Sequence, residues 1–100
     1  MTINITREND TYTVALEGSL DPISSPQLQD ELDPILPTAK KIIFELSGLE
    51  YISSSGIRVV LATYRDLKNH GGELLLLHPT ESVSRVFHIT KLDGFLTIKA

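Results

Sequence analysis

Apolar and polar side chains alternate in two segments near the start of the chain. Apolar residues stand at every second position over 2–6 and again over 12–17, and a polar run fills 8–10. The apolar positions are Ile3, Ile5, Tyr12, Val14 and Leu16. A period of two is typical of strands with one buried face, and Glu-Asn-Asp has the composition of a turn. The pattern therefore predicts an N-terminal β-hairpin.

Two later segments, 42–46 and 73–77, are apolar at nearly every position. Such runs favour central strands that are covered on both faces. Between them, over about 54–70, apolar residues recur at helical spacing, and Gly71 and Gly72 supply a stop. The helical positions are Ile57, Val60, Leu61, Tyr64 and Leu67. Strand, helix and strand in this order predict a right-handed βαβ unit.

Another helix is predicted after the hairpin. Ser24 or Ser25 is suited to cap it, because Pro26 is tolerated at a first helical position. Its apolar stripe comprises Leu28, Leu32 and Ile35 or Leu36. Pro34 and Pro37 should bend or end this helix early, because proline lacks the backbone N–H that a helix interior needs.

The last part of the chain predicts one more helix and one more strand. Thr80 follows Pro79 and can cap a short helix, a turn follows at 93–94, and 95–98 reads as a strand. The inner face of this helix would be formed by Val83, Val86 and Phe87. The order β-β-α-β-α-β-α-β predicts a single α/β domain over 1–100, with a mixed sheet and about three helices.

Composition and charge exclude several classes of function. The chain has 100 residues, a formal net charge of −4 and no cysteine. Nucleic acid is not an expected partner, because phosphate binding needs clustered cations. Without cysteine there is no disulfide or thiolate chemistry, in agreement with a reducing, cytoplasmic compartment. No signal peptide or membrane span is expected, because the longest apolar runs are far below the roughly 20 residues that a bilayer needs.

Three consecutive serines, Ser53, Ser54 and Ser55, lead from the central strand into the longest predicted helix and are followed by Gly56. Ser54 is a suitable helix cap, and the residue after it lies in the first turn, where free N–H groups and the helix dipole favour negative charge. A phosphate there would carry about −1.5 to −2 charges without unfolding the helix. The alternative is that the serines only solvate a loop and cap the helix.

No catalytic or metal-binding pattern accompanies the serines. The stretch is not a G-x-S-x-G elbow, and nothing assigns His70, His78 or His88 the role of a base. His70 is explained by the last turn of a helix, and the other two histidines lack metal-ligand spacing. We therefore expect no catalytic residues, no metal and no cofactor.

Several motifs together resemble the STAS family of anti-sigma-factor antagonists. The motifs are Glu17-Gly18-Ser19-Leu20-Asp21 with Pro26-x-Leu28, Ile43-Phe44-Glu45-Leu46-Ser47-Gly48-Leu49, Tyr51-Ile52-Ser53-Ser54-Ser55-Gly56-Ile57, and the segment Val83 to Leu92. Each motif is loose, but their order and spacing cover nearly the whole chain. The resemblance implies a STAS-like fold over 1–100.

The resemblance also implies a function. In that family the domain binds an anti-sigma factor that is also a serine kinase, and the unphosphorylated domain sequesters this factor so that a sigma factor is freed. A serine phosphatase removes the phosphate. The target serine matches Ser55, with Ser54 as the alternative, and Asp21 matches an acidic residue that lies near the target. We expect the partner to bind Asp21, the three serines and 56–58, a range that comprises Gly56, Ile57 and Arg58.

Two features depart from the family pattern. Ser53 stands where the family commonly has aspartate, which removes a carboxylate that could orient the acceptor hydroxyl. The family's C-terminal helix should be short or absent, because the sequence ends at Ala100 soon after the last predicted strand. An apolar face left uncovered in this way would suit another protein or a second copy, which makes a homodimer possible.

Three functions compete on this evidence. The first is a phosphorylation-regulated binding switch, and the second is a constitutive STAS subunit of a cytoplasmic transport or signalling complex, in which the serines serve as caps only. The third is an enzyme, for which the sequence offers no acid–base pair, metal cluster or phosphate-binding glycine loop. The sequence favours the first.

Overall fold

A computed structural model describes all residues from 1 to 100. Its elements are β1 (Thr2–Glu8), β2 (Thr11–Leu20), α1 (Ser24–Leu32), β3 (Lys41–Ile52), α2 (Ser54–Asn69), β4 (Glu73–Leu77), α3 (Glu81–Ile89), the short 3-10 helix η1 (Leu92–Gly94) and β5 (Thr97–Lys99). The predicted element order and α/β fold are confirmed, and within these residues no helix follows β5. None of the helices is long and apolar enough to cross a membrane.

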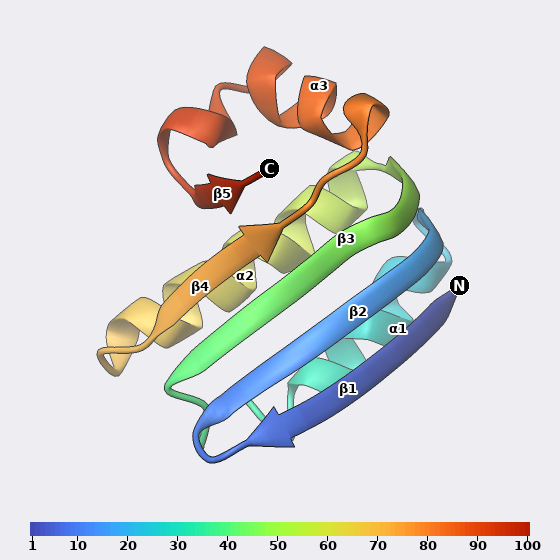
Figure 1. Cartoon of the computed structure of the whole chain (residues 1–100). Coiled ribbons are helices and arrows are strands. Elements are labelled where there is room, and N and C mark those ends of the chain that lie inside the picture. The colour runs from blue at the N-terminus through green and yellow to red at the C-terminus, as the bar shows by residue number, and fades with distance from the viewer.

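The five strands form one mixed sheet in the order β1-β2-β3-β4-β5 (Figure 1). β1 pairs with β2 as the predicted antiparallel hairpin, and Asn9 in its tight turn adopts a φ of 58°, which asparagine tolerates better than most residues. β2, β3, β4 and β5 are mutually parallel, so three crossovers link them. β3 lies at the centre and is the longest strand.

Helices α1 and α2 lie side by side against one face of the sheet, and no helix covers the opposite face (Figure 1). Burial along β3 accordingly alternates, with Phe44 buried and Ile43 half-buried. The prediction that 42–46 and 73–77 are covered on both faces is therefore wrong. The apolar residues of the open face shield one another instead, because Ile43 lies opposite Leu75. Polar neighbours complete this face, including Glu45, which hydrogen-bonds to His78 at 2.9 Å.

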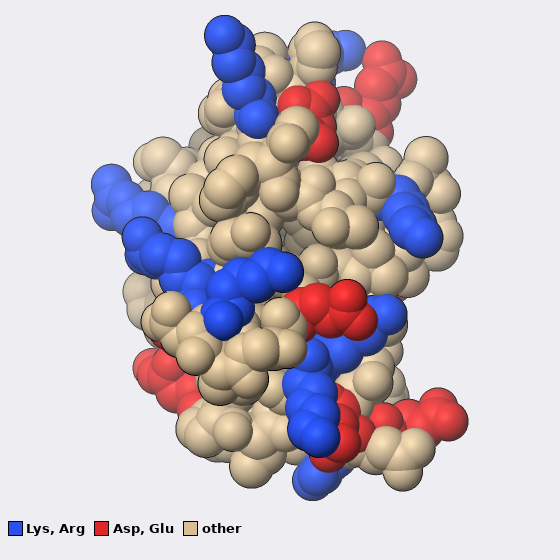
Figure 2. Space-filling model, turned by 90° about the vertical axis from the view of Figure 1, so that its left-hand side faces the viewer, with Lys and Arg blue, Asp and Glu red and all other residues tan.

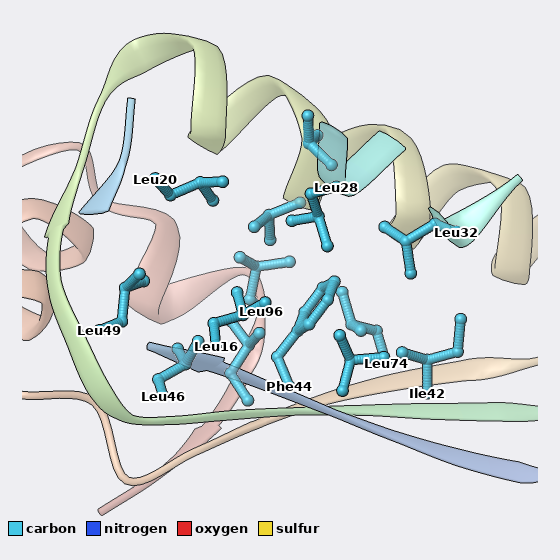
Figure 3. Close-up of a cluster of buried hydrophobic side chains, with 14 of the residues drawn as sticks. Leu16, Leu20, Leu28, Leu32, Ile42, Phe44, Leu46, Leu49, Leu74 and Leu96 are labelled. Atoms are coloured by element: carbon cyan, nitrogen blue, oxygen red, sulfur yellow. The ribbon is translucent and has the colours of Figure 1, made fainter. Parts of the chain in front are cut away.

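The core fills the space between the sheet and the two helices (Figure 3). Phe44 lies near its middle, with Leu28 and Leu32 of α1 above it and Ile42 beside it. Burying each such side chain contributes about 1.5–3 kcal/mol. This single core fixes the ends of the central strands relative to the helices that follow them.

The ends of α1 and the start of α3 can be compared with the prediction. α1 begins at Ser24 rather than at Pro26, and its end at Leu32, just before Pro34, is as predicted. Thr80 caps α3 as predicted, because its hydroxyl accepts the N–H of Val83 at 3.4 Å. The same hydroxyl donates to the carbonyl of Leu49 at 2.9 Å, which ties α3 to the end of β3.

The last strand begins two residues later than predicted. The expected strand over 95–98 begins only at Thr97, because Phe95 and Leu96 both donate their N–H groups to the carbonyl of Leu92. These two residues therefore continue the turn. Leu96 is buried in the core, whereas Phe95 is 57% exposed.

Candidate functional site

The carboxyl ends of β2 and β3 meet at one edge of the sheet. Leu20 pairs with Ile52 at the end of the two strands, and the N–H of Ser53 donates to the carbonyl of Leu20 at 2.8 Å. Asp21 and Ser53 therefore begin neighbouring loops, and the predicted juxtaposition of Asp21 with the serine cluster is present in the fold.

Ser53, and not Ser54 as predicted, is the cap of α2. Its backbone is extended (φ −92°, ψ 173°), and its hydroxyl accepts the N–H of Gly56 at 3.2 Å. The cap lies here because β3 keeps an extended backbone as far as Ile52, so helical geometry begins at Ser54. An aspartate at position 53 could make the same hydrogen bond. Serine in its place thus keeps the cap and removes one negative charge from the site.

The other two serines occupy the first turn of α2 and differ in exposure. Ser54 is exposed, Ser55 is half-buried, and Ser53 is only 7% exposed. Neither Ser54 nor Ser55 makes a side-chain hydrogen bond within the protein, so both hydroxyls are free to react or to bind. The positive end of the α2 dipole adjoins both of them.

Gly56 allows the start of α2 to lie directly on the core. A Cβ at this position would lie 2.7 Å from Cγ of Leu20 and 2.9 Å from Cγ1 of Ile52. Both of these side chains are buried. Any larger residue would lift the first turn, so glycine fixes the position of Ser54 and Ser55 relative to β2 and β3.

Asp21 organises the neighbouring loop. Its Oδ1 accepts the N–H groups of Ile23 and Ser24 at 2.9 and 2.8 Å, and this turn starts α1. The predicted cap by Ser24 or Ser25 is therefore wrong, because the aspartate supplies the acceptor earlier in the chain. The hydrogen bond from the Ser24 N–H is the main cause that holds the pKa of Asp21 below its usual 3.8, although burial opposes it. The carboxylate stays ionised near neutral pH.

Two exposed apolar side chains flank this edge. Tyr51, near the end of β3, is 52% exposed, and Ile23, between Asp21 and α1, is 88% exposed. Neither residue was predicted to bind a partner, because Tyr51 entered only as part of a family motif and Ile23 stands beside a proline with no motif of its own. Exposed aromatic and branched side chains beside polar groups are common at protein interfaces.

The remaining predicted residues, Ile57 and Arg58, lie on either side of the same turn. Ile57 is half-buried and packs against the core, whereas Arg58 is exposed and makes no ion pair. All predicted partner-binding residues thus come from the two neighbouring loops and the first turns of α2. Ser54 and Arg58 are exposed at this edge of the sheet, whereas Ser53 and Gly56 are buried.

The histidines are engaged elsewhere. His70 contacts the carbonyl of Ala39, His78 contacts Glu45, and His88 contacts Asp93, each at about 2.9 Å. None hydrogen-bonds to a serine. No group of three or more His, Asp or Glu side chains is placed to hold a metal ion. The site offers hydroxyls, one carboxylate and apolar contacts, which is chemistry for binding another protein and for accepting a phosphate.

The sequence and the fold of the chain match those of a known family of domains. A family model described as "STAS domain" matches residues 2–100. The chain belongs to the STAS-domain family. It is 32% identical over 103 residues to a protein of Bacillus subtilis (strain 168) named anti-sigma-B factor antagonist. The alignment covers 100% of this chain and 94% of that protein. A Staphylococcus aureus (strain NCTC 8325) protein of the same name is 26% identical over 99 residues, with 98% and 92% covered.

Solved structures share the fold. The anti-sigma factor antagonist SpoIIAA in its unphosphorylated form superposes with a TM-score of 0.87 at 24% identity, covering 99% of this chain and 89% of that chain. The phosphorylated form of SpoIIAA, described as a Bacillus cell fate determinant, gives a TM-score of 0.80 over 99% of this chain and 91% of that chain, also at 24% identity. Both forms of that protein therefore have the architecture described above.

Proposed function

We propose that this chain is an anti-sigma-factor antagonist that is regulated by phosphorylation. In its unphosphorylated form it binds an anti-sigma factor that is also a serine kinase, and this binding frees a sigma factor. The observation that carries the proposal is the exposed Ser54 and the half-buried Ser55, whose hydroxyls make no hydrogen bond within the protein, at the start of α2 beside the Asp21 loop and exposed apolar side chains. The names of the related proteins support the same assignment.

The hydroxyl that receives the phosphate belongs to Ser54 or to Ser55. The family resemblance points to Ser55, and the exposure of the side chains favours Ser54, because a kinase must reach the oxygen. Ser53 is excluded by its burial and by the hydrogen bond that it accepts from Gly56. Fragment mapping of the modified protein distinguishes the two.

A phosphate in this turn would leave the fold intact. The unpaired N–H groups of the first helical turn can donate hydrogen bonds to a phosphate, and Arg58 lies one turn beyond Ser54 with no ion pair of its own. A partner packed over the serine would instead have to bury a doubly charged group. A penalty of about 2.7 kcal/mol lowers affinity a hundredfold.

The rest of the proposal follows the family. A serine phosphatase restores the unmodified form, the chain works in the cytoplasm, and it acts without a cofactor and without catalysis of its own. Asp21, Ser53 and residues 54–58 form the centre of the partner contact, and Tyr51 and Ile23 extend it. Pairing of two copies is compatible with this use of the site, because the uncovered sheet face lies elsewhere.

The experiment is intact-mass analysis of the protein from its own cells, followed by fragment mapping. We expect a fraction with about 80 Da of added mass, on Ser54 or Ser55. Ser54→Ala and Ser55→Ala, made separately, should show which one abolishes the modification, and Asp at the same position should weaken partner binding about a hundredfold. A protein that is unmodified under every growth condition, and whose Asp variants keep all partners, would instead be the constitutive subunit of a complex.

A further inference from the structure

A shallow apolar groove runs between α2 and η1, away from the serines. It has a volume of about 360 Å³ and is lined by Leu61, Tyr64, Arg65, Leu92 and Phe95. The ring centres of Tyr64 and Phe95 lie 4.9 Å apart, and both rings belong to this lining. Phe95 is 57% exposed although it is a large apolar residue, so water reaches much of this lining.

Three cations of α2 lie in or near the groove, and none of them forms an ion pair. Arg65 lines the groove, Lys68 lies over the ring of Tyr64, and Arg58 lies two turns before Arg65. Arg58 and Arg65 are seven residues apart, so they lie on the same helical face, and the Lys68 ammonium lies 5.6 Å from the ring centre of Tyr64. Unpaired cations gathered beside an apolar groove stand out in a chain of net charge −4.

Figure 2 shows one side of the molecule, the side on which α2 ends. Several Lys and Arg side chains cross the middle of this face among uncharged residues, and Asp or Glu side chains lie beside and below them. The basic side chains that have no acidic partner are complementary to acidic residues of a binding partner.

One face of α2 connects the groove with the candidate phosphorylation site. Ser54, Arg58, Leu61 and Arg65 follow one another at helical spacings of four, three and four residues, so they form one outward stripe on α2. The 450 Å³ hollow on the other side of this stripe is also lined by Arg58, Leu61 and Arg65. A partner that contacts the serines could therefore extend along α2.

We propose that this groove binds an acidic amphipathic helix of a partner protein. Its apolar face would cover Leu61, Tyr64 and Phe95, and its flanking carboxylates would pair with Arg58, Arg65 and Lys68. α2 has 16 residues, so a helix of about 12–15 residues fits alongside it. Three cations are too few for stable attachment to an anionic membrane, which takes about four to eight. The inference goes beyond the proposed function and does not require phosphorylation.

The test uses a fluorescein-labelled synthetic peptide of about 15 residues, with Leu at i, i+3, i+4 and i+7 and Glu at the flanking positions. A matched peptide has Lys in place of every Glu. Binding is measured by fluorescence polarisation at about 0.05 M and about 0.5 M salt. We expect saturable binding of the acidic peptide, at least tenfold tighter than that of the basic peptide and weaker at high salt.

Variants locate the binding. Arg65→Glu and Phe95→Ala should each weaken binding of the acidic peptide at least tenfold, and both positions are exposed, so folding should be retained and is checked by circular dichroism. Lys40→Glu is the matched control, because it makes the same change of charge at an 80% exposed side chain outside the groove, and should change binding less than about twofold.

The outcomes separate this inference from the proposed function. The unmodified chain should bind the acidic peptide, so peptide binding does not depend on phosphorylation of Ser54 or Ser55. The inference is overturned if the acidic peptide shows no saturable binding, if it binds no tighter than the basic peptide, or if Arg65→Glu behaves like Lys40→Glu. None of these results would alter the phosphorylation experiment.

Discussion

Replacing Gly56 with alanine should destabilise the protein, although alanine is the better helix former. The new Cβ would lie 2.7 and 2.8 Å from Cγ and Cδ2 of Leu20 and 2.9 Å from Cγ1 of Ile52, closer than carbon atoms normally approach. Leu20 is fully buried and Ile52 nearly so, so neither side chain has free space to move into. The cost of such overpacking is about 1–3 kcal/mol.

The gain in helix propensity opposes this cost but does not cancel it. Three contacts shorter than 3.0 Å place the overpacking cost in the upper part of its range, about 2–3 kcal/mol. Alanine is favoured over glycine inside a helix by about 0.8–1 kcal/mol, so the net loss for Gly56→Ala should be about 1–2 kcal/mol. For a chain of this size, that loss lowers the Tm by roughly 4–15 °C. Thermal and urea unfolding followed by circular dichroism measure both quantities.

A matched control and a double variant test the cause. Gly94→Ala adds a methyl group with nothing within 4 Å, so it should change stability by less than about 0.5 kcal/mol. In a Leu20→Ala background the methyl group of Gly56→Ala loses its two closest contacts and keeps only the one with Cγ1 of Ile52, so its cost should be clearly smaller. If Gly56→Ala is no worse than Gly94→Ala, or if its cost is unchanged beside Leu20→Ala, close packing is not what glycine provides here.

Three further predictions concern the edge of the sheet. Ser53→Ala should cost about 0.5–2 kcal/mol in urea unfolding, and Ser53→Asp should restore most of it; equal stability of all three proteins would contradict the role of Ser53 as cap. Because the pKa of folded Asp21 lies below 3.8, its contribution to stability is complete above that pH and is lost as the pH falls further. The stability difference between the wild type and Asp21→Ala should therefore be constant from pH 5 to 8 and shrink below about pH 4, and a difference that persists at low pH would refute this. Tyr51→Ala and Ile23→Ser should weaken partner binding about tenfold and leave the Tm within a few degrees, and unchanged affinity in both would remove them from the interface.

Local chemistry made much of the fold predictable. The hairpin over 2–17 could be predicted because alternating apolar and polar residues indicate a strand with one buried face. Helix α2 could be predicted because five apolar residues recur at helical spacing before two glycines. The Thr80 cap was also readable, since threonine after proline and before a short amphipathic run satisfies several rules together. These signals lie within a few residues of each other and need no tertiary information.

Features that depend on distant neighbours were harder to predict. The cap fell on Ser53 instead of Ser54 because the pairing of β3 with β2 keeps the backbone extended to Ile52. α1 started early because Asp21, and not a serine, supplied the acceptor. The open face of the sheet resembled a buried one in sequence, since its apolar side chains shield one another across strands.

The candidate site was predictable as a stretch of chain but not as a surface. The serines, Asp21 and Arg58 were selected from motif and position, and the fold brings their loops together. Tyr51 and Ile23 were not selected, because exposure depends on which face of a strand or turn the fold leaves uncovered. The groove beside Phe95 has the same origin, since it exists only when α2 and η1 lie next to each other.

The fixed start of α2 also has a kinetic consequence. Its backbone is held by the Ser53 cap, by the bond from Ser53 to Leu20 and by the close packing of Gly56, so a partner would find this turn already ordered. Ordering a flexible loop would cost about 1–2 kcal/mol per residue, and here that cost has been met in folding. If the chain is phosphorylated as proposed, the association rate constant for the partner should therefore change little. The loss of affinity should come from a larger dissociation rate constant.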